Sequence, residues 1–369
     1  MTAHTALTAL ADRCDRLVDE GSLAGWVAGV RDADGQDVRV GGCRSLGGEG
    51  MSEDTQFAMS SSTKPLAGIL TARLVELGVL GLDDPIARWL PEMARPAVLT
   101  SPDAPLEDTV PAERPITVRH LLTMTPGFGW VGEPGPLAEA MEAKEIAPGP
   151  WGPAMAPDEF VSRLAALPLA SQPGTAWRYH TSSDVLGVVL ARASGQSVGE
   201  LLDEHVLGPL RMTDTSFVGD PERLATPYSS AEGGGLTPFP VPAGTYTEPP
   251  PFESLAAGLV STVPDQLAAL ASLVGSGPTV LSPESRRALR TDHLTRDQRA
   301  TAEGFLEPGC GWGHQVEIRP TGPIGWAGGL GTIGYADPTT GRAAFLATQV
   351  SVDGAGTVAA FDQFWSLLD

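Results

Sequence analysis

Strand-like stretches stand near both ends of the chain and helical stretches fill its middle, which strongly limits the folds open to it. The first, LAGWVAGVRDADGQDVRVGG at residues 23–42, has two β-rich runs around an Asp-Gly turn and predicts a hairpin. Strand signals return only near the C-terminus, in GWGHQVEI, IGWAGGLGTIGYAD and RAAFLATQV. From about 83 to 225, helical segments alternate with Pro and Gly loops, and no alternating strand pattern is evident. We therefore expect one sheet assembled from both termini.

This layout predicts two domains. An α/β (α+β) domain would comprise residues 1–82 and 226–369, and an all-helical domain would be inserted as residues 83–225. Both chain ends predict helices, and MTAHTALTALADRCDRLVDEG repeats Ala and Leu at amphipathic spacing. Residues 226–252 are rich in Pro, Gly, Ser and Thr, so we expect a long surface loop there.

The net charge of −21 narrows the classes of partner. An acidic surface repels nucleic-acid phosphates and anionic lipid, so neither nucleic acid nor membrane is expected as a partner. The N-terminus lacks a basic stretch followed by an apolar run, and we expect a cytoplasmic protein. Cys14, Cys43 and Cys310 lack C-x-x-C spacing, which argues against a disulfide framework or a structural zinc site and favours buried free thiols.

The stretch FAMSSSTKPLAG, residues 57–68, combines three serines with a lysine. The apolar spacing that follows predicts a helix, and a Ser-x-x-Lys pair on a helix puts both side chains on one face. Only Ser61 stands three residues before Lys64, because Ser60 stands four before it and Ser62 two before it. A lysine with a lowered pKa can take the proton of a serine hydroxyl. A helix-capping serine beside a solvated lysine fits the same pattern.

Lysine is scarce in this chain, which has 22 arginines and two lysines. Arginine cannot release its proton, so a position that shuttles protons is one of the few that needs lysine. The scarcity therefore favours a chemical role for Lys64.

The stretch RYHTSSDVLGVVLARASG, residues 178–195, places Tyr179 at the entrance of an apolar helix. A tyrosine beside a lysine can exchange protons with it, although a core or capping tyrosine fits this place as well. His180 is the one histidine that we expect in a pocket. We expect Asp184 to be a local hydrogen-bonding anchor rather than an acid catalyst.

The glycine-rich stretch IGWAGGLGTIGYADPTTG, residues 324–341, resembles a strand. Glycines inside a strand commonly mark a close approach of the backbone to a ligand. Gly328 and Gly329 could present N–H groups to a carbonyl oxygen and form an oxyanion hole with the backbone of Ser61. A glycine-rich strand packed tightly against a helix is the alternative.

No sequence signature of a metal or cofactor site is present, and none is expected. The histidines have no H-x-H or H-x-x-x-H pairing; they are His4, His120, His180, His205, His293 and His314. The glycine runs GGEG and EGGGL match neither a phosphate-binding loop nor a dinucleotide fingerprint. We expect a structural role for His120.

Five stretches, spread over nearly the whole chain, follow one another in the order known from one protein family. They are FAMSSSTKPLAG, ITVRHLLTMTPGFG, PGTAWRYHTSSDVLG, AAGLVSTVPDQLAAL and GWAGGLGT. Together they resemble the serine β-lactamase and penicillin-binding-protein superfamily, in particular its class C branch, the family VIII carboxylesterases and the lovastatin-type acyltransferases. The resemblance implies a β-lactamase-like fold, with an antiparallel sheet flanked by helices, a helical domain, and an active site in the cleft between them. It also implies an acylated nucleophile at Ser61, a proton-transfer pair of Lys64 and Tyr179, and oxyanion N–H groups from Ser61 and Gly329.

Two departures from the family pattern bear on the substrate. Trp326, Ala327 and Gly328 stand where β-lactamases and peptidases usually carry Lys-Thr-Gly, and Tyr179-His180-Thr181 replaces Tyr-x-Asn. The lysine and the amide contact β-lactam or peptide substrates in the family, so their absence weakens the expectation of a β-lactamase or D-peptidase. The esterases and lovastatin-type acyltransferases tolerate both changes.

Aromatic and methionine side chains of the helical region suggest an apolar cleft; they are Met124, Phe128, Trp130, Trp151 and Met155. We count Phe128, Trp130 and Trp151 with His180 and Thr181 as candidate substrate-binding residues. The expected function is a serine carboxylesterase acting on a small-molecule acyl donor. Acyl transfer to an alcohol or amine is the alternative, and a non-catalytic binding module of the same fold is a further one.

Overall fold

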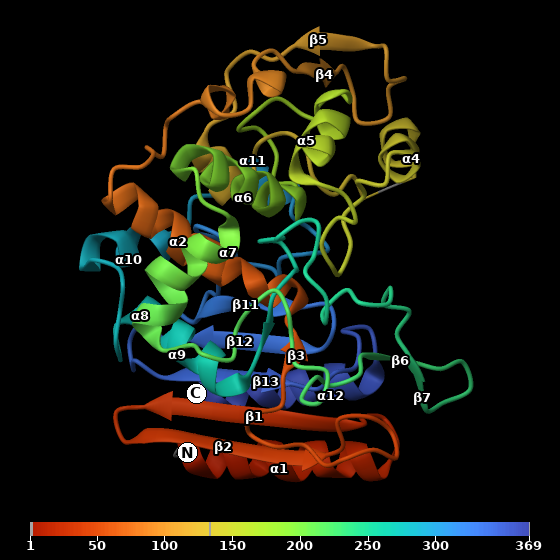
Figure 1. Ribbon diagram of the computed structural model, residues 1–369, viewed down its shortest axis with the longest axis vertical. Coiled ribbons are helices and arrows are strands. Elements are labelled where there is room, and N and C mark those ends of the chain that lie inside the picture. The colour runs from red at the N-terminus through yellow and green to blue at the C-terminus, as the bar shows by residue number, and fades with distance from the viewer. Residues whose placement is uncertain (1–2, 133, 369) are drawn as a thin grey trace.

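A computed structural model describes residues 3–132 and 134–368. A seven-stranded sheet lies at its centre with the strand order β2-β1-β13-β12-β11-β10-β9, and every neighbouring pair is antiparallel (Figure 1). The strands come from both ends of the chain: β1 (Gly25–Asp32), β2 (Gly35–Gly42), β9 (Gly311–Trp312), β10 (Glu317–Ile318), β11 (Ile324–Gly328), β12 (Thr332–Ala336) and β13 (Ala343–Ala347). Pairing of β1 with β13 joins the two ends, so the expected antiparallel sheet built from both termini is confirmed.

The two faces of the sheet are covered by different helices. Ala28 of β1 packs in the cluster that includes α1 (Ala3–Asp19) and α12 (Ala355–Phe364). Its neighbour Val27 belongs to the larger core that includes α9 (Val263–Val274). Successive strand residues point to opposite faces, so one face rests on the two terminal helices and the other on α9. The helices expected at both chain ends are confirmed.

The middle of the chain is mainly helical and lies on the β11 side of the sheet, away from β1 and β2 (Figure 1). Its helices are α3 (Val118–Leu122), α4 (Pro136–Ala143), α5 (Pro157–Ala165), α6 (Thr181–Ser194), α7 (Val198–Leu202) and α8 (Gly208–Leu210), with a π-helical turn at Asp203–Leu207 and 3-10 turns at Ile86–Arg88 and Pro91–Met93. The expectation that no strand lies here is wrong for one small hairpin, β4 (Ala97–Leu99) and β5 (Thr109–Pro111). These strands have only three residues each, too few to show an alternating pattern. The division at residues 82/83 and 225/226 stays a prediction.

Residues 226–252 are only partly the surface loop that their composition predicts. They include a two-stranded hairpin, β6 (Tyr228–Ser230) and β7 (Leu236–Pro238), which projects from the body of the molecule in Figure 1. Tyr228 and Tyr246 are buried. The Tyr228 hydroxyl accepts a hydrogen bond from the N–H of Leu46 at 2.9 Å. Aromatic anchors thus attach a Pro- and Gly-rich segment to the core.

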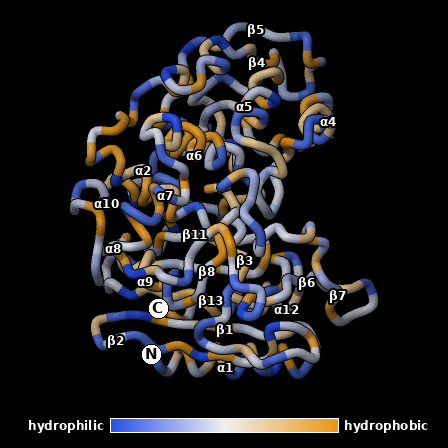
Figure 2. Tube along the Cα trace, in the orientation of Figure 1, coloured by the Kyte–Doolittle hydropathy of each residue, from blue (hydrophilic) through white to orange (hydrophobic). Residues whose placement is uncertain are grey.

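The helix α2 (Lys64–Glu76) follows directly from a 3-10 turn, η1 (Ser60–Thr63). Nine of its residues are buried, because the helix lies between the sheet side and the helical side of the molecule. Figure 2 shows hydrophobic stretches on the neighbouring α6, which packs against α2. Every side chain of α2 from Lys64 to Thr71 is therefore buried, and the turn η1 before it supplies the serines that line a pocket.

The remaining helices are α10 (Pro283–Leu289), α11 (Arg296–Ala300) and the 3-10 turn η5 (Trp365–Leu367); the short strands β3 (Phe57–Ala58) and β8 (Val260–Ser261) pair with each other. All three cysteines are free, and Cys14 and Cys310 are buried as expected. Cys43 is only half-buried, in an isolated β-bridge at the end of β2. Across residues 3–132 and 134–368, no helix combines the length and the apolar character needed to cross a membrane.

Candidate active site

Ser61 and Lys64 lie on one face of the turn that opens α2. Lys64 is fully buried, and its Nζ donates hydrogen bonds to Ser61 Oγ at 2.9 Å and to the carbonyl oxygen of Ala256 at 2.8 Å. The hydroxyl of Ser62 instead contacts Thr332 Oγ1 at 2.8 Å. Of the three neighbouring serines, Ser61 is the one that contacts the lysine, as its spacing predicts.

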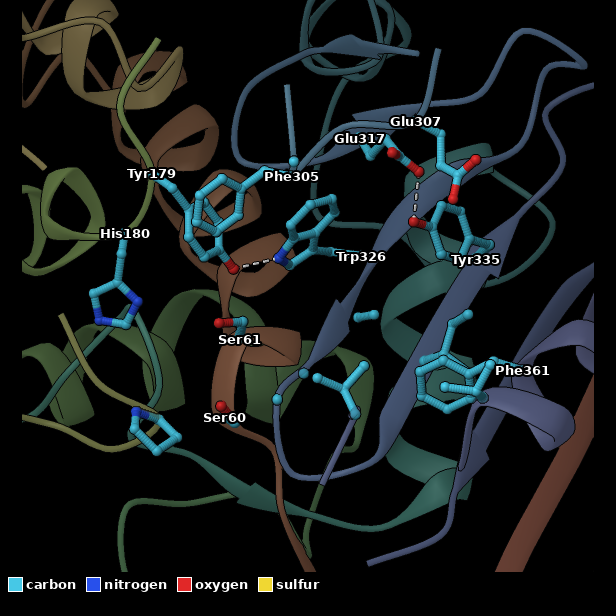
Figure 3. A pocket seen from close by; sticks show the side chains of 18 of the residues that line it. Ser60, Ser61, Tyr179, His180, Phe305, Glu307, Glu317, Trp326, Tyr335 and Phe361 are labelled. Carbon is cyan, nitrogen blue, oxygen red and sulfur yellow. Dashed lines mark hydrogen bonds between the residues drawn. The ribbon is translucent and has the colours of Figure 1, made fainter. Parts of the chain in front are cut away.

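Tyr179 lies over the same lysine. Lys64 Nζ is 4.6 Å from the centroid of the Tyr179 ring, and Trp326 Nε1 donates a hydrogen bond to the Tyr179 hydroxyl at 2.6 Å (Figure 3). Burial raises the pKa of Tyr179 above its usual range, while hydrogen bonds with Ser61 and Trp326 act in the opposite direction. The phenol is therefore protonated at neutral pH.

Burial shifts the pKa of Lys64 in the opposite direction to that of Tyr179. It lowers the pKa of Lys64 from 10.5 to about 7, because the charged ammonium loses its hydration, and the negative charge of Asp184 partly offsets this. The neutral amine is therefore well populated at neutral pH. An amine in this state has a free lone pair for the proton of the Ser61 hydroxyl.

Asp184 anchors the loop that holds the lysine. Its Oδ1 accepts hydrogen bonds from Ser254 Oγ at 2.6 Å and from the N–H of Ala256 at 3.4 Å. Burial raises the pKa of Asp184 to about 6, against the effect of these hydrogen bonds and of Lys64. The carboxylate thus fixes the segment whose Ala256 carbonyl accepts from Lys64, which agrees with the expected anchoring role.

The end of strand β11 lies against the serine turn. A side chain at Gly328 would collide with the carbonyl oxygen of Met59 and with Thr332 Oγ1, so only glycine permits this approach. Strand β10 pairs only with Ile324 and Gly325, which leaves the rest of that edge of β11 open. Within the described residues, the N–H groups of Ser61 and Gly329 donate no hydrogen bond.

A pocket of about 720 Å³ opens over Ser61 (Figure 3). Of the residues that the sequence suggested, it is lined by Ser61, Tyr179, His180, Trp326, Ala327, Gly328, Gly329 and Trp130. Lys64 lies beneath this lining, with no exposed surface.

Five other suggested residues do not line this pocket. Phe128 and Met155 are buried in the main core, and Met124 is buried in the aromatic cluster beneath Tyr179. Trp151 packs edge-on against Phe239, and Thr181 is buried at the first position of α6. Apolar composition shows that such side chains are inside but does not show which of them face a cavity.

Phe305 lines the pocket, although no sequence signal marked it. Its ring packs 4.7 Å from that of Tyr179 and 5.8 Å from that of Trp130. Phe305 lies in an irregular segment far from both partners in the chain, so only tertiary packing brings it here. The wall of the pocket near Ser61 is consequently aromatic.

The far end of the pocket is polar. Glu317 is buried and accepts a hydrogen bond from the Tyr335 hydroxyl at 2.7 Å, and Arg319 lies 3.6 Å from the same carboxylate oxygen. The Arg319 guanidinium also stacks 4.2 Å above the Trp365 ring. These polar groups make contacts mainly with one another.

His120 lies at the start of α3. The His120 ring accepts the N–H of Thr117, and the Thr117 hydroxyl accepts the N–H of His120, which caps α3 as a structural residue would. In the described part of the chain, no three His, Cys, Asp or Glu side chains are grouped as metal ligands.

Three comparisons relate the chain to known proteins. A family model described as Beta-lactamase matches residues 10–363. Protein Rv1367c of Mycobacterium tuberculosis (strain ATCC 25618 / H37Rv) is 36% identical over 338 residues, which cover 84% of this chain and 82% of that protein. Esterase EstB of Burkholderia gladioli is 32% identical over 335 residues, which cover 83% and 80%.

Among solved structures, EstCE1, described as a hydrolase with promiscuous acyltransferase activity, shares the fold with a TM-score of 0.82. The two chains are 22% identical, and the match covers 99% of each. The β-lactamase-like fold expected from the sequence is confirmed. The chain belongs to the Beta-lactamase family.

Proposed function

We propose that this protein is a serine carboxylesterase that forms an acyl-enzyme on Ser61. The observation that carries the proposal is the 2.9 Å contact between Ser61 Oγ and a fully buried lysine at the floor of the pocket. A serine hydroxyl is a weak nucleophile until a base takes its proton, and Lys64 is placed and tuned to be that base.

In the acylation step, neutral Lys64 accepts the proton of Ser61 Oγ as the oxygen attacks the ester carbonyl carbon. The N–H groups of Ser61 and Gly329 would hold the oxygen of that carbonyl as it becomes negative. Tyr179, which is protonated at neutral pH, lies against Lys64 and can relay the proton to the departing alkoxide. Water then attacks the acyl-enzyme and releases the acid.

The neutral wall of the pocket supports an ester substrate. Trp326 supplies an N–H to Tyr179 but no positive charge for a substrate carboxylate. Trp130 and Phe305 add aromatic surface, which suits an apolar acyl or alkoxy group better than the carboxylate of a penicillin. Transfer of the acyl group to an alcohol or amine is the second candidate, because a pocket of about 720 Å³ has room for an acceptor beside a small acyl group.

Rates on p-nitrophenyl butyrate and on a chromogenic cephalosporin test the substrate class. We expect kcat/KM for the ester to be higher by about 10³-fold or more, since a missing polar contact to a charged group typically costs several kcal/mol. The opposite order would reject the esterase proposal. Adding n-butanol or butylamine then separates the two candidates, because an acyltransferase forms butyl butyrate or the amide at the expense of butyric acid.

A further inference from the structure

His180 has a strained backbone. Its dihedral angles are φ +84° and ψ −75°, and the N–H of Thr181 donates to the carbonyl oxygen of Tyr179 at 3.3 Å. These values define a γ-turn of the rare, strained kind. A non-glycine residue holds such a conformation only where its surroundings impose it, and such residues concentrate at functional sites.

The surroundings impose the turn from two sides. The N–H of Trp130 donates to the carbonyl oxygen of Tyr179 at 2.9 Å, and the N–H of Ser183 donates to that of His180 at 3.0 Å. Gly129 lies so close that a side chain there would be 2.7 Å from the carbonyl oxygen of Arg178. Consecutive residues of an extended chain point to opposite sides. The turn instead brings the side chains of both Tyr179 and His180 into one pocket.

The imidazole of His180 has no hydrogen bond to any other described residue, although the residue is only 5% exposed. Its closest charged neighbour is Asp184, whose Oδ2 lies 3.8 Å from Nε2 and thus beyond hydrogen-bond distance. Neither ring nitrogen is among the buried atoms without a partner, so the ring edge reaches the pocket. Figure 3 shows the ring on the side of Ser61 opposite Trp326.

The other polar side chains around Ser61 are either hydrogen-bonded or covered, since Ser60 Oγ has no partner but is buried. Lys64 Nζ contacts Ser61 and Ala256, and the Trp326 N–H is used on the Tyr179 hydroxyl. The imidazole of His180 is therefore the polar side-chain group beside Ser61 that is left for a second molecule. Burial, with the charge of Lys64, lowers the pKa of His180 well below its usual range, so the ring is neutral and offers one donor and one acceptor.

We propose that His180 binds the acyl acceptor, the water or small alcohol that attacks the acyl-enzyme on Ser61. The inference rests on the proposed function and assigns its second half-reaction. The imidazole forms a hydrogen bond with the acceptor hydroxyl and aims its oxygen at the acyl carbon. As the new C–O bond forms, the hydroxyl proton passes to the Lys64 and Tyr179 pair. The bond from the acyl carbon to Ser61 Oγ then breaks, and the pair returns that proton to Oγ.

Two substitutions distinguish the effect of the imidazole ring from that of the strained backbone turn. Glycine adopts positive φ freely, so His180→Gly keeps the backbone and removes the ring. Asparagine also tolerates positive φ, and its amide carries a donor and an acceptor, so His180→Asn keeps hydrogen bonding. Circular dichroism and thermal melting of both variants check that the fold is retained.

The readout is the amount of butyryl-enzyme during turnover of p-nitrophenyl butyrate, measured by rapid acid quench and intact mass. We expect His180→Gly to accumulate the adduct because deacylation slows by roughly 10- to 100-fold, the loss of one well-placed hydrogen bond. The deacylation rate of His180→Asn should fall less than that of His180→Gly. The yield of butyl butyrate with added n-butanol should fall in His180→Gly.

Three results would overturn the inference. In the first, His180→Gly deacylates as fast as the wild type. In the second, folded His180→Asn is as slow as His180→Gly, which would indicate proton abstraction by the imidazole. In the third, the folded variants lose acylation and deacylation equally. A wild-type enzyme that never carries a butyryl group would refute the proposed function itself, and this outcome is visible before any variant is made.

Discussion

On one side of the pocket, Lys64 has no exposed surface and contacts Ser61 Oγ and the Ala256 carbonyl, whose loop is held by Asp184. On the other side, Trp326 and Phe305 form an aromatic wall, and Trp130 is 44% exposed. The lysine side is closed, and its amine is held by two hydrogen bonds, whereas the aromatic side is more open and makes few polar contacts.

This difference assigns the two sides of the pocket different roles, the proton transfer to the lysine side and the substrate fit to the aromatic side. Burial on the lysine side sets the protonation state of the base, because the charged ammonium loses its hydration there. The aromatic side gives shape and apolar surface, so changes there should alter which substrate fits and by how much. Substitutions on the lysine side should therefore change the rate by orders of magnitude, and substitutions on the aromatic side by small factors.

The largest effect is expected for Lys64→Met. Loss of the base should lower kcat/KM by about 10²- to 10⁴-fold, and Lys64→Arg should be as inactive because arginine keeps its proton. Methionine removes a buried amine whose charge is unfavourable there, so the melting temperature should rise. An active Lys64→Arg enzyme would contradict the proposed base.

The pH dependence should follow the same lysine. Its pKa is about 7 in the folded protein, so acylation should rise with pH through about 7 and then level off. Asp184 raises the pKa of Lys64, so Asp184→Asn, which can still accept both hydrogen bonds at Oδ1, should shift this rise to lower pH. A rise that stays in place in Asp184→Asn would mean that another group titrates.

The free energy of unfolding should depend on pH in a way that reflects the lowered pKa of Lys64. Between about pH 7 and 10.5, Lys64 is neutral when folded but protonated in the unfolded chain. The unfolded state then binds more protons, so this lysine's contribution to the free energy of unfolding rises with pH across that range. Lys64→Met should lack the rise. Urea unfolding of both proteins at several pH values measures the difference.

Trp326→Phe probes the point where the two sides meet. It removes the N–H that donates to the Tyr179 hydroxyl at 2.6 Å and keeps most of the aromatic surface. A single neutral hydrogen bond is worth about 1 kcal/mol, so kcat/KM for p-nitrophenyl butyrate should fall by roughly fivefold. A loss as large as that of Lys64→Met would show that the two sides are not separate in function.

The smallest effect is expected at Trp130, on the open part of the aromatic wall. Trp130→Ala should raise KM for the ester by roughly threefold through lost apolar contact, with kcat little changed. Phe128→Leu is the matched control, since Phe128 is buried in the core. It should lower the free energy of unfolding by about 1 kcal/mol and leave KM unchanged.

The sequence predicts the lysine side much better than the aromatic side. Ser61 and Lys64 are three residues apart on one helical turn, so local geometry alone brings them together. For Tyr179 and Gly329 the residues alone left structural alternatives open, because both reach the site through tertiary structure, and the family resemblance favoured the catalytic interpretation. Strand signals at the two chain ends predicted one sheet built from both termini, and the family resemblance implied its antiparallel order.

Tertiary packing explains what the sequence could not predict. Phe128 and Trp151 are as apolar as Trp130, yet the first faces the core and the second faces Phe239. Phe305 comes from an irregular segment with no periodic pattern. The γ-turn at His180 depends on hydrogen bonds from Trp130 and Ser183, which a single-sequence pattern does not indicate.

Intact mass after treatment with a fluorophosphonate probe tests the central claim most directly. We expect one adduct per chain in the wild type, mapped to Ser61 by peptide sequencing. Ser61→Ala should carry no adduct, whereas the matched control Ser60→Ala should still be labelled. An adduct of unchanged amount in Ser61→Ala would contradict the account.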